Sequence, residues 1–139
     1  MVITLSATQA PLRQGRRTLP GEDLGSVSKA RSWVTGTLLR WEVEPPEELP
    51  MLVSELVTNA IKHTRSGLPD GRVTLRLDIY GDRIRLVVKD AGPRPGRRVR
   101  RGDPSPEDTH GRGLLLVEAL SLAWGPINTG SGVFVEISR

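Results

Sequence analysis

The sequence predicts an α+β fold: a two-layer α/β sandwich in which helices cover one face of a mixed, mostly antiparallel sheet. Before residue 63, apolar residues recur at helical spacing in two segments, and between residues 73 and 88 two alternating strands flank a tight turn. A further apolar helix and a strand follow residue 113. Three helices against such a sheet form two layers around one core. The 139 residues suit a single domain, 1–139.

The composition is that of a globular protein and excludes several kinds of functional site. Apolar residues make up 37% of the chain and charged residues 26%. There is no Cys, which excludes disulfides and Cys-based zinc sites, and the two His are far apart. No apolar run approaches the roughly 20 residues of a membrane span, and the N-terminus lacks the apolar segment of a secretory signal. We therefore expect a cytoplasmic protein with no membrane contact.

The positive charge is local. The net charge is +4, but five Arg lie between Arg94 and Arg101, and the rest of the chain without them totals −1. Tyr80 is the one aromatic residue between positions 42 and 123, so the sequence shows no platform for stacking bases. These facts argue against a nucleic-acid partner and favour an Arg-rich solvated loop, whose role stays open.

The N-terminal part is expected to hold a short strand and a helix. Residues 2–5 are apolar enough for the strand, and a polar connection follows through Pro20 and Gly21. From Ser26, the expected N-cap, apolar residues recur every three or four positions as far as Trp41. This spacing predicts one amphipathic helix.

A second helix and a hairpin follow. Pro45 and Pro46 end the first helix, and the next runs to about Lys62 because Pro and acidic residues suit a helix start. Residues 73–80 alternate apolar with polar, Gly81-Asp82 forms a two-residue turn, and a second strand returns.

The C-terminal part is expected to contain a long loop, a helix and a strand. Residues 91–112 are interrupted by Gly and Pro, which predicts a long loop. Residues 113–124 are apolar nearly all round, which suggests a buried helix. Residues 133–137 alternate and predict the last strand.

Glu55 and Asn59 form the first candidate site. At 100° per residue they lie about 40° apart on the second helix, with Lys62 about 20° to the other side of Glu55. A carboxylate can act as a base, and an amide oxygen suits Mg²⁺. The same spacing also fits an ordinary solvated helix face.

Asp90 forms the second candidate. It follows the returning strand in phase with that strand's buried residues, so it needs a partner in the protein or in a ligand. Gly92 permits a close approach of the backbone. The alternative is an Asp that turns outward through a bulge.

The third candidate is the run His110-Gly111-Arg112-Gly113, directly before the expected helix. Flexible Gly and free amides at a helix start can bind an anion, and Arg112 could assist. Gly at a loop-to-helix junction is also common, so this run alone stays ambiguous. No P-loop sequence is present.

In this order and spacing, the three segments resemble the GHKL, or Bergerat-fold, ATPases. Within that superfamily the chain is most similar to the small anti-sigma-factor serine kinases of Gram-positive bacteria. SELVTNAIKHT resembles their N-box, VVKDAGPRP the G1 box and HGRGLLLVEALSLAWG the G2 box. The resemblance covers most of the chain, from the helix at Ser26 to the GSGVFVEI ending.

The resemblance implies a site for ATP or ADP with Mg²⁺. Glu55 would be the general base, and Asn59 would ligate Mg²⁺ bound to the phosphates. Asp90 would accept a hydrogen bond from the adenine amino group above Gly92, and residues 93–110 would form the ATP lid. The full set implied to bind nucleotide is Asn59, Lys62, Asp90, Gly92, Gly111, Arg112, Gly113 and Leu114.

Two positions depart from the family pattern. The G1 box often carries a second Gly, where this chain has Arg94, and this change would reshape the lid. The last strand often begins with a Gly-Lys-Thr-like run, where this chain has Gly130-Ser131-Gly132. The second change removes a cation from the phosphate side and bears on catalytic strength rather than on the fold.

The resemblance implies a Ser/Thr protein kinase that phosphorylates a STAS-class anti-anti-sigma protein and binds a sigma factor; a homodimer is compatible with it. The alternative is a nucleotide-dependent partner-binding module without kinase activity. A sensor histidine kinase fragment is disfavoured, because no helical hairpin with a phosphoacceptor His precedes the N-box. His63 and His110 are interpreted as structural or pocket-edge residues.

Overall fold

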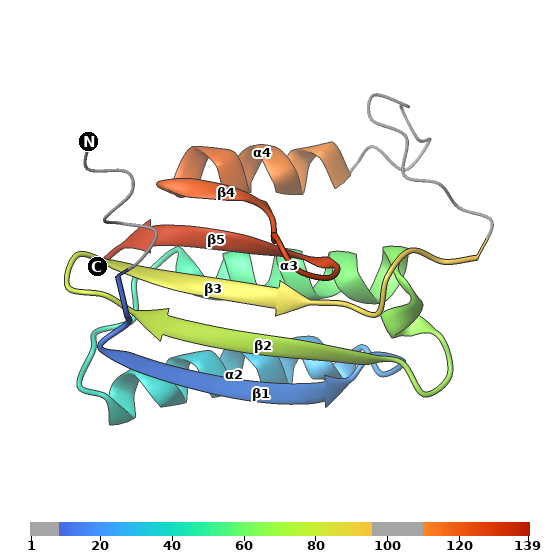
Figure 1. Ribbon diagram of the computed structural model, residues 1–139, viewed down its shortest axis with the longest axis horizontal. Coiled ribbons are helices and arrows are strands. Elements are labelled where there is room, and N and C mark those ends of the chain that lie inside the picture. Colours follow the sequence, from blue (N-terminus) through green and yellow to red (C-terminus); the bar gives the residue numbers. More distant parts are fainter. Residues whose placement is uncertain (1–8, 96–109) are drawn as a thin grey trace.

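The computed structural model describes residues 9–95 and 110–139, without the side chains of 110–114. The strands are β1 (Arg13–Pro20), β2 (Arg72–Ile79), β3 (Arg83–Lys89), β4 (Ala123–Pro126) and β5 (Gly132–Ser138). The helices are α2 (Gly25–Arg40), α3 (Leu49–His63) and α4 (His110–Leu120), with a short 3-10 helix η1 (Arg65–Gly67). The strands form one sheet in the order β1-β2-β3-β5-β4 (Figure 1).

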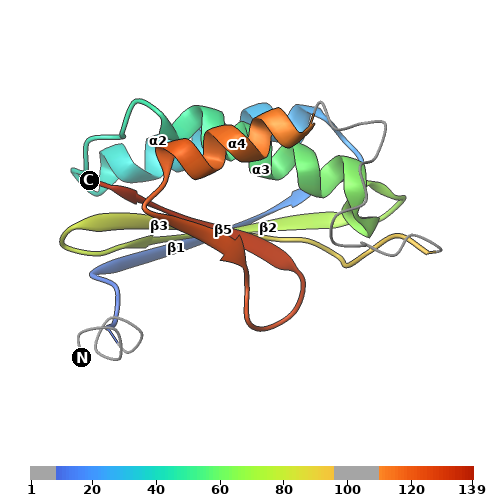
Figure 2. The same cartoon turned by 90° about the horizontal axis from the view of Figure 1, so that it is seen from above.

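The predicted two-layer α+β architecture is confirmed. The three helices lie on one face of the sheet, as Figure 2 shows with the helices above the strands. Every strand pair is antiparallel, so the described sheet is purely antiparallel rather than mixed. The core lies between the sheet and the helices α2 and α3, and consists mainly of Leu, Val and Ile.

The central hairpin is confirmed in detail. Ile79 pairs with Ile84, and the amide of Tyr80 donates to the Arg83 carbonyl at 2.9 Å across the Gly81-Asp82 turn. The alternating apolar positions of β2 and β3 are fully buried against the helices, as the period of two requires: Val73, Leu75, Leu77, Ile79, Ile84, Leu86 and Val88.

Both predicted N-terminal helices are present, but the predicted cap of the first is wrong. Ser26 lies inside α2, and its hydroxyl donates to the Pro20 carbonyl at 2.6 Å. The carboxylate of Asp23 instead accepts from the amide of Gly25 at 2.8 Å, so Asp23 satisfies a free amide at the helix start. The second helix, α3, ends at His63, one residue beyond the prediction.

The predicted polar connection before Gly21 is wrong, because residues 13–20 form β1. The strand pairs with β2 along its whole length at the sheet edge. Leu19 is its one buried residue, and six of its eight residues are Arg, Gln, Gly or Thr that are exposed or half-buried at that edge. A polar edge strand lacks the alternation that reveals a strand in a sequence. The strand expected at residues 2–5 lies outside the described residues.

The C-terminal helix is shorter and less buried than predicted. α4 ends at Leu120, and Ala123–Pro126 form β4, which pairs with β5. Of the α4 side chains that the structure describes, Val117 is buried, whereas Leu115 is 65% exposed. An all-apolar run does not distinguish a core helix from one at the sheet edge followed by a strand. The last strand, β5, is confirmed.

Candidate functional site

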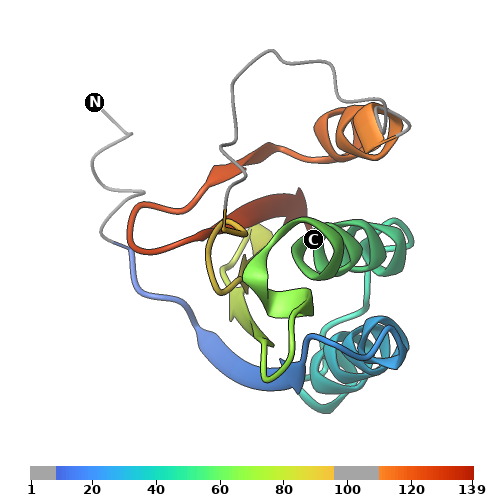
Figure 3. The ribbon, with the colours of Figure 1, turned by 90° about the vertical axis from the view of Figure 1, so that its right-hand side faces the viewer.

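The three candidate segments meet at one end of the molecule. The end of α3, the chain after β3 and the start of α4 all lie at the right of Figure 1 and face the viewer in Figure 3. Helices α3 and α4 are in contact. The fold therefore brings together segments whose candidate residues, from Glu55 to Leu114, are separated by up to about 60 positions in the sequence.

Helix α3 carries the first candidate residues along the border of its buried face. Seven of its apolar residues between Leu49 and Ile61 are buried in the core, whereas Met51 is exposed. Glu55 and Asn59 are half-buried, one helical turn apart, and Lys62 is exposed. The carboxylate and the amide thus lie between the core and solvent, where each can reach a ligand.

Asp90 lies just beyond β3 and is half-buried. Its amide donates to the Ser131 carbonyl at 3.0 Å, and its Oδ1 accepts from the amide of Gly92 at 2.8 Å. The half-buried carboxylate therefore has a hydrogen-bond partner for one of its two oxygens, within its own turn. No described residue bonds to its Oδ2, which leaves one acceptor for a ligand.

Gly92 adopts a φ of 94°, in the left-handed region that favours glycine. Apart from its two chain neighbours, no described residue has a heavy atom within 4 Å of the point where a Cβ would stand. The turn after Asp90 therefore has open space on that side of the backbone, which suits a flat ligand group.

Backbone contacts join the turn after Asp90 to the end of α3. Thr64 and Pro93 form an isolated antiparallel bridge. The amide of Arg65 donates to the Gly92 carbonyl at 2.8 Å, and its guanidinium Nε donates to the Pro93 carbonyl at 3.0 Å. The candidate adenine-side turn and the helix of Asn59 are thus held in one fixed arrangement.

Ser66 adds a buried polar link that the sequence did not reveal. Its hydroxyl accepts from the amide of Ala91 at 2.9 Å and donates to the Arg72 carbonyl at 2.7 Å. The residue is fully buried, so each bond is protected from water. A single Ser in a loop gives no sequence signal for such a role.

Arg94 caps the C-terminal end of α3. Its Nε donates to the Thr64 carbonyl and its Nη2 to the Ile61 carbonyl, both at 3.0 Å. A cation here also complements the negative end of the helix dipole. The Cβ of an alanine at Gly67 would stand 1.9 Å from the Ile61 carbonyl oxygen, so glycine makes room for this arrangement.

These contacts correct, at Arg94, the prediction that the Arg cluster from Arg94 to Arg101 belongs to a solvated loop. Pro93 and Arg94 are bonded to α3, and Arg94 is half-buried rather than a free lid cation. Residue 110 already belongs to α4. The remainder of the expected lid and the other four Arg of the cluster, within 96–109, lie outside the described residues.

The third candidate segment forms the first turn of α4 rather than a loop before it. The helix begins at His110, so Gly111, Arg112, Gly113 and Leu114 lie within it. The first four N–H groups of a helix have no partner within the helix and can bind an anion.

The chemistry of α3 is compatible with Mg²⁺ at a nucleotide. Mg²⁺ prefers oxygen ligands and is usually held by one or two protein oxygens together with substrate phosphates. The half-buried amide of Asn59 supplies such an oxygen. Among the described residues there is no group of three His, Asp or Glu that could hold a metal ion, and no described helix is long and apolar enough to cross a membrane.

Comparison with known proteins identifies relatives over most of the chain. The family model of the histidine kinase-like ATPase domain matches residues 22–130. A protein of Listeria innocua named serine-protein kinase RsbW is 33% identical over 105 residues, which cover 68% of this chain and 67% of the relative. A protein of Oceanobacillus iheyensis with the same name is 30% identical over 124 residues, which cover 81% and 78%.

Proposed function

The chain belongs to the histidine kinase-like ATPase domain family, and from this we propose that it is an ATP-dependent protein serine/threonine kinase. Its substrate would be a STAS-class anti-anti-sigma protein, it would also bind a sigma factor, and it would act in the cytoplasm. The observation that supports this best is the meeting of the Glu55–Asn59 face, the Asp90 turn and the start of α4 at one end of the fold.

Asp90 would recognise adenine through its Oδ2. Its Oδ1 is already bonded to the amide of Gly92, so the turn fixes the carboxylate and presents the second oxygen. An ionised carboxylate can only accept hydrogen bonds, which suits the adenine amino group and opposes the carbonyl that guanine carries at that position. The open space beside Gly92 would accommodate the base.

The phosphates would lie between α3 and the start of α4. The backbone amides of Gly111 and Arg112, in the free first turn of α4, would bind phosphate oxygens at the positive end of the helix, whereas Gly113 and Leu114 lie beyond that turn. Asn59 and the exposed Lys62 would approach the phosphates from α3. Bound Mg²⁺ would neutralise charge on the phosphates as the phosphoryl group is transferred.

Glu55 would be the general base. It would accept the proton of the substrate hydroxyl while that oxygen bonds to the γ-phosphorus and the bond from phosphorus to the β–γ bridging oxygen breaks, releasing ADP. Its place one turn from Asn59 sets the base near the metal side of the nucleotide.

The test is transfer of radiolabel from ATP to a STAS-domain partner, with ATP affinity measured in parallel. Asn59→Ala should weaken Mg²⁺-dependent ATP binding, because one oxygen ligand is lost. Glu55→Gln should leave affinity nearly unchanged and lower transfer by about 10²–10⁴-fold. Glu118→Gln, an exposed acid on α4, is the matched control. Undiminished transfer by Glu55→Gln would contradict the assignment of the base.

A binding module without kinase activity is the second candidate. The run Gly130-Ser131-Gly132 offers no cation to the phosphates, and the Ser131 carbonyl is already bonded to the amide of Asp90. This module would bind ATP and its partner yet transfer no label. Binding by the wild-type protein without transfer to any STAS partner would favour it over the kinase.

A further inference from the structure

The sheet face that α2, α3 and α4 do not cover, here called the open face, carries a row of basic side chains. Arg16 stands directly opposite Arg76, and Arg85 lies between Asp78 on β2 and Glu136 on β5. Two like charges in a direct cross-strand pair repel each other. The basic residues at outward positions are Arg16, Arg72, Arg76, Arg83, Arg85 and Lys89.

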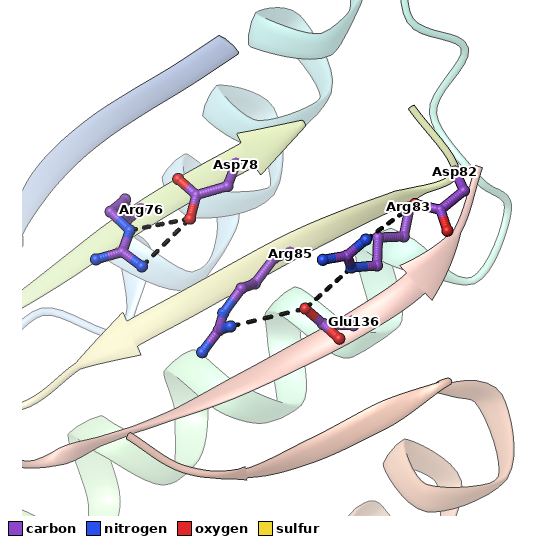
Figure 4. A network of polar contacts seen from close by, with 6 residues as sticks. All are labelled: Arg76, Asp78, Asp82, Arg83, Arg85 and Glu136. Carbon is purple, nitrogen blue, oxygen red and sulfur yellow. Dashed lines mark hydrogen bonds and ion pairs between the residues drawn. The ribbon is translucent and has the colours of Figure 1, made fainter. Parts of the chain in front are cut away.

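The two carboxylates of this face are already shared among the arginines (Figure 4). Asp78 is paired with Arg76 at 3.2 Å and also accepts from Gln14 at 2.8 Å. Glu136 lies 3.3 Å from Arg83 and 3.7 Å from Arg85.

Arg83 is well neutralised and does not supply the surplus charge. Burial lowers the pKa of Arg83, but hydrogen bonds to Glu136 and Asp82 outweigh it and raise the pKa above its ordinary value. No described carboxylate lies within 4.0 Å of Arg16 or Lys89. Positive charge that is unpaired among the described residues therefore remains on both strands that flank Arg76, at Arg16 on β1 and at Lys89 on β3.

A hollow at the end of β3 gathers this surplus charge. It measures about 180 Å³ and has three cations and no carboxylate in its lining. The lining residues are Arg76, Arg85, Val87, Lys89, Ile127, Asn128 and Thr129. The Nε of Arg85 is buried and has no acceptor among the described residues. A buried donor without an acceptor is costly, and it belongs to a side chain that lines the hollow.

We propose that this basic hollow binds an acidic side chain from a segment of a partner protein. Its volume is below the roughly 300–1,000 Å³ of small-molecule pockets, so it suits one carboxylate rather than a whole free ligand. A second hollow of about 340 Å³, lined by Gln14, Gly15, Arg16 and Arg76, shares Arg76 with the first. The two together suit successive acidic residues of one segment.

The same face is poorly suited to nucleic acid. Its two aromatic rings are covered, since the guanidinium of Arg83 lies 4.1 Å from the centre of the Tyr80 ring and that of Arg85 lies 4.4 Å from Phe134. No described ring on this face is therefore free to stack on a base.

The proposed docking site is separate from the nucleotide site and does not depend on it. The helices that carry Glu55, Asn59 and the start of α4 lie on the opposite face of the sheet, as Figure 2 shows. Docking can therefore be measured without nucleotide.

The experiment measures fluorescence anisotropy of a labelled hexaglutamate peptide on the full chain at low salt. Arg85→Gln combined with Lys89→Gln should weaken binding at least tenfold. Arg13→Gln combined with Lys29→Gln removes the same charge from exposed positions elsewhere and should change affinity less than twofold. Binding should also fall as salt is raised. Circular dichroism checks that each variant folds.

Lys89→Glu provides an independent variant, because Lys89 has no ion pair with a described residue that the change would break. This charge reversal should weaken peptide binding more than neutralisation by Lys89→Gln does. Equal weakening by the two double variants would overturn the proposal, since only net charge would then matter. It would also be overturned if an oligothymidylate of equal charge bound more tightly and with the same sensitivity to Lys89→Glu. Competition by inorganic phosphate at equal charge concentration would show a site for free anions instead.

Discussion

Arg94→Ala tests the connection between α3 and the Asp90 turn. The substitution removes the two hydrogen bonds that Arg94 donates to the Thr64 and Ile61 carbonyls, and it removes the cation at the negative end of α3. The bridge of Thr64 with Pro93 and the bonds of Arg65 remain. The turn should therefore loosen without leaving the helix.

The magnitude follows from these two bonds. A hydrogen bond from a charged group contributes about 1.5–3 kcal/mol. Both bonds come from one half-buried side chain, and water replaces part of what is lost, so we expect a loss of about 2 kcal/mol in the free energy of unfolding. For a chain of this size that corresponds to a fall in Tm of about 6–10 °C.

The assay combines thermal unfolding with ATP titration. Arg94→Lys keeps the charge but cannot reach both carbonyls as a planar fork does, so its Tm should lie between those of Arg94→Ala and the wild type. Arg17→Ala, an exposed residue without a hydrogen bond to a described side chain, is the control. ATP affinity should fall more in Arg94→Ala than in Arg17→Ala. A Tm within 1 °C of the wild type would refute the capping role.

Two further predictions concern the same junction. Asp90→Asn should keep the bond to the amide of Gly92 through its remaining oxygen but weaken ATP by about 1.5–3 kcal/mol, because an amide nitrogen would then face the adenine amino group. Calorimetry checks this, and equal affinity of the wild type for ATP and GTP would contradict it. Gly67→Ala should lower the free energy of unfolding by at least about 1–3 kcal/mol, since its Cβ would overlap the Ile61 carbonyl. Denaturant unfolding measures this loss, and a wild-type midpoint would contradict the steric argument.

The sequence revealed elements whose two sides differ in polarity. The hairpin of β2 and β3 and the helices α2 and α3 bury one side of each element, so the periods of 2 and 3.6 are visible in the residues. The three candidate segments could be identified in the sequence because their residues, order and spacing resemble those of a known family. Their meeting at one end of the sheet follows from the topology.

The missed features depend on contacts between distant residues. β1 is an edge strand with polar residues on both sides, and β4 follows an apolar helix after only two residues. The bonds of Ser66 to Ala91 and Arg72, like the capping by Arg94, join segments that come together only in the folded chain. Neither the hydrophobic pattern nor residue spacing contains this information.

The end of β3 separates two charges that would otherwise pair. Lys89 and Asp90 are neighbours in the sequence, yet the alternation of a strand directs successive side chains to opposite faces. Lys89 lines the basic hollow on the open face, and Asp90 enters the turn that is bonded to α3. Lys89 pairs with Gly132 at the start of β5, and the amide of Asp90 donates to the carbonyl of Ser131, the residue just before that strand. The sheet thus supplies a short physical route between the two proposed sites.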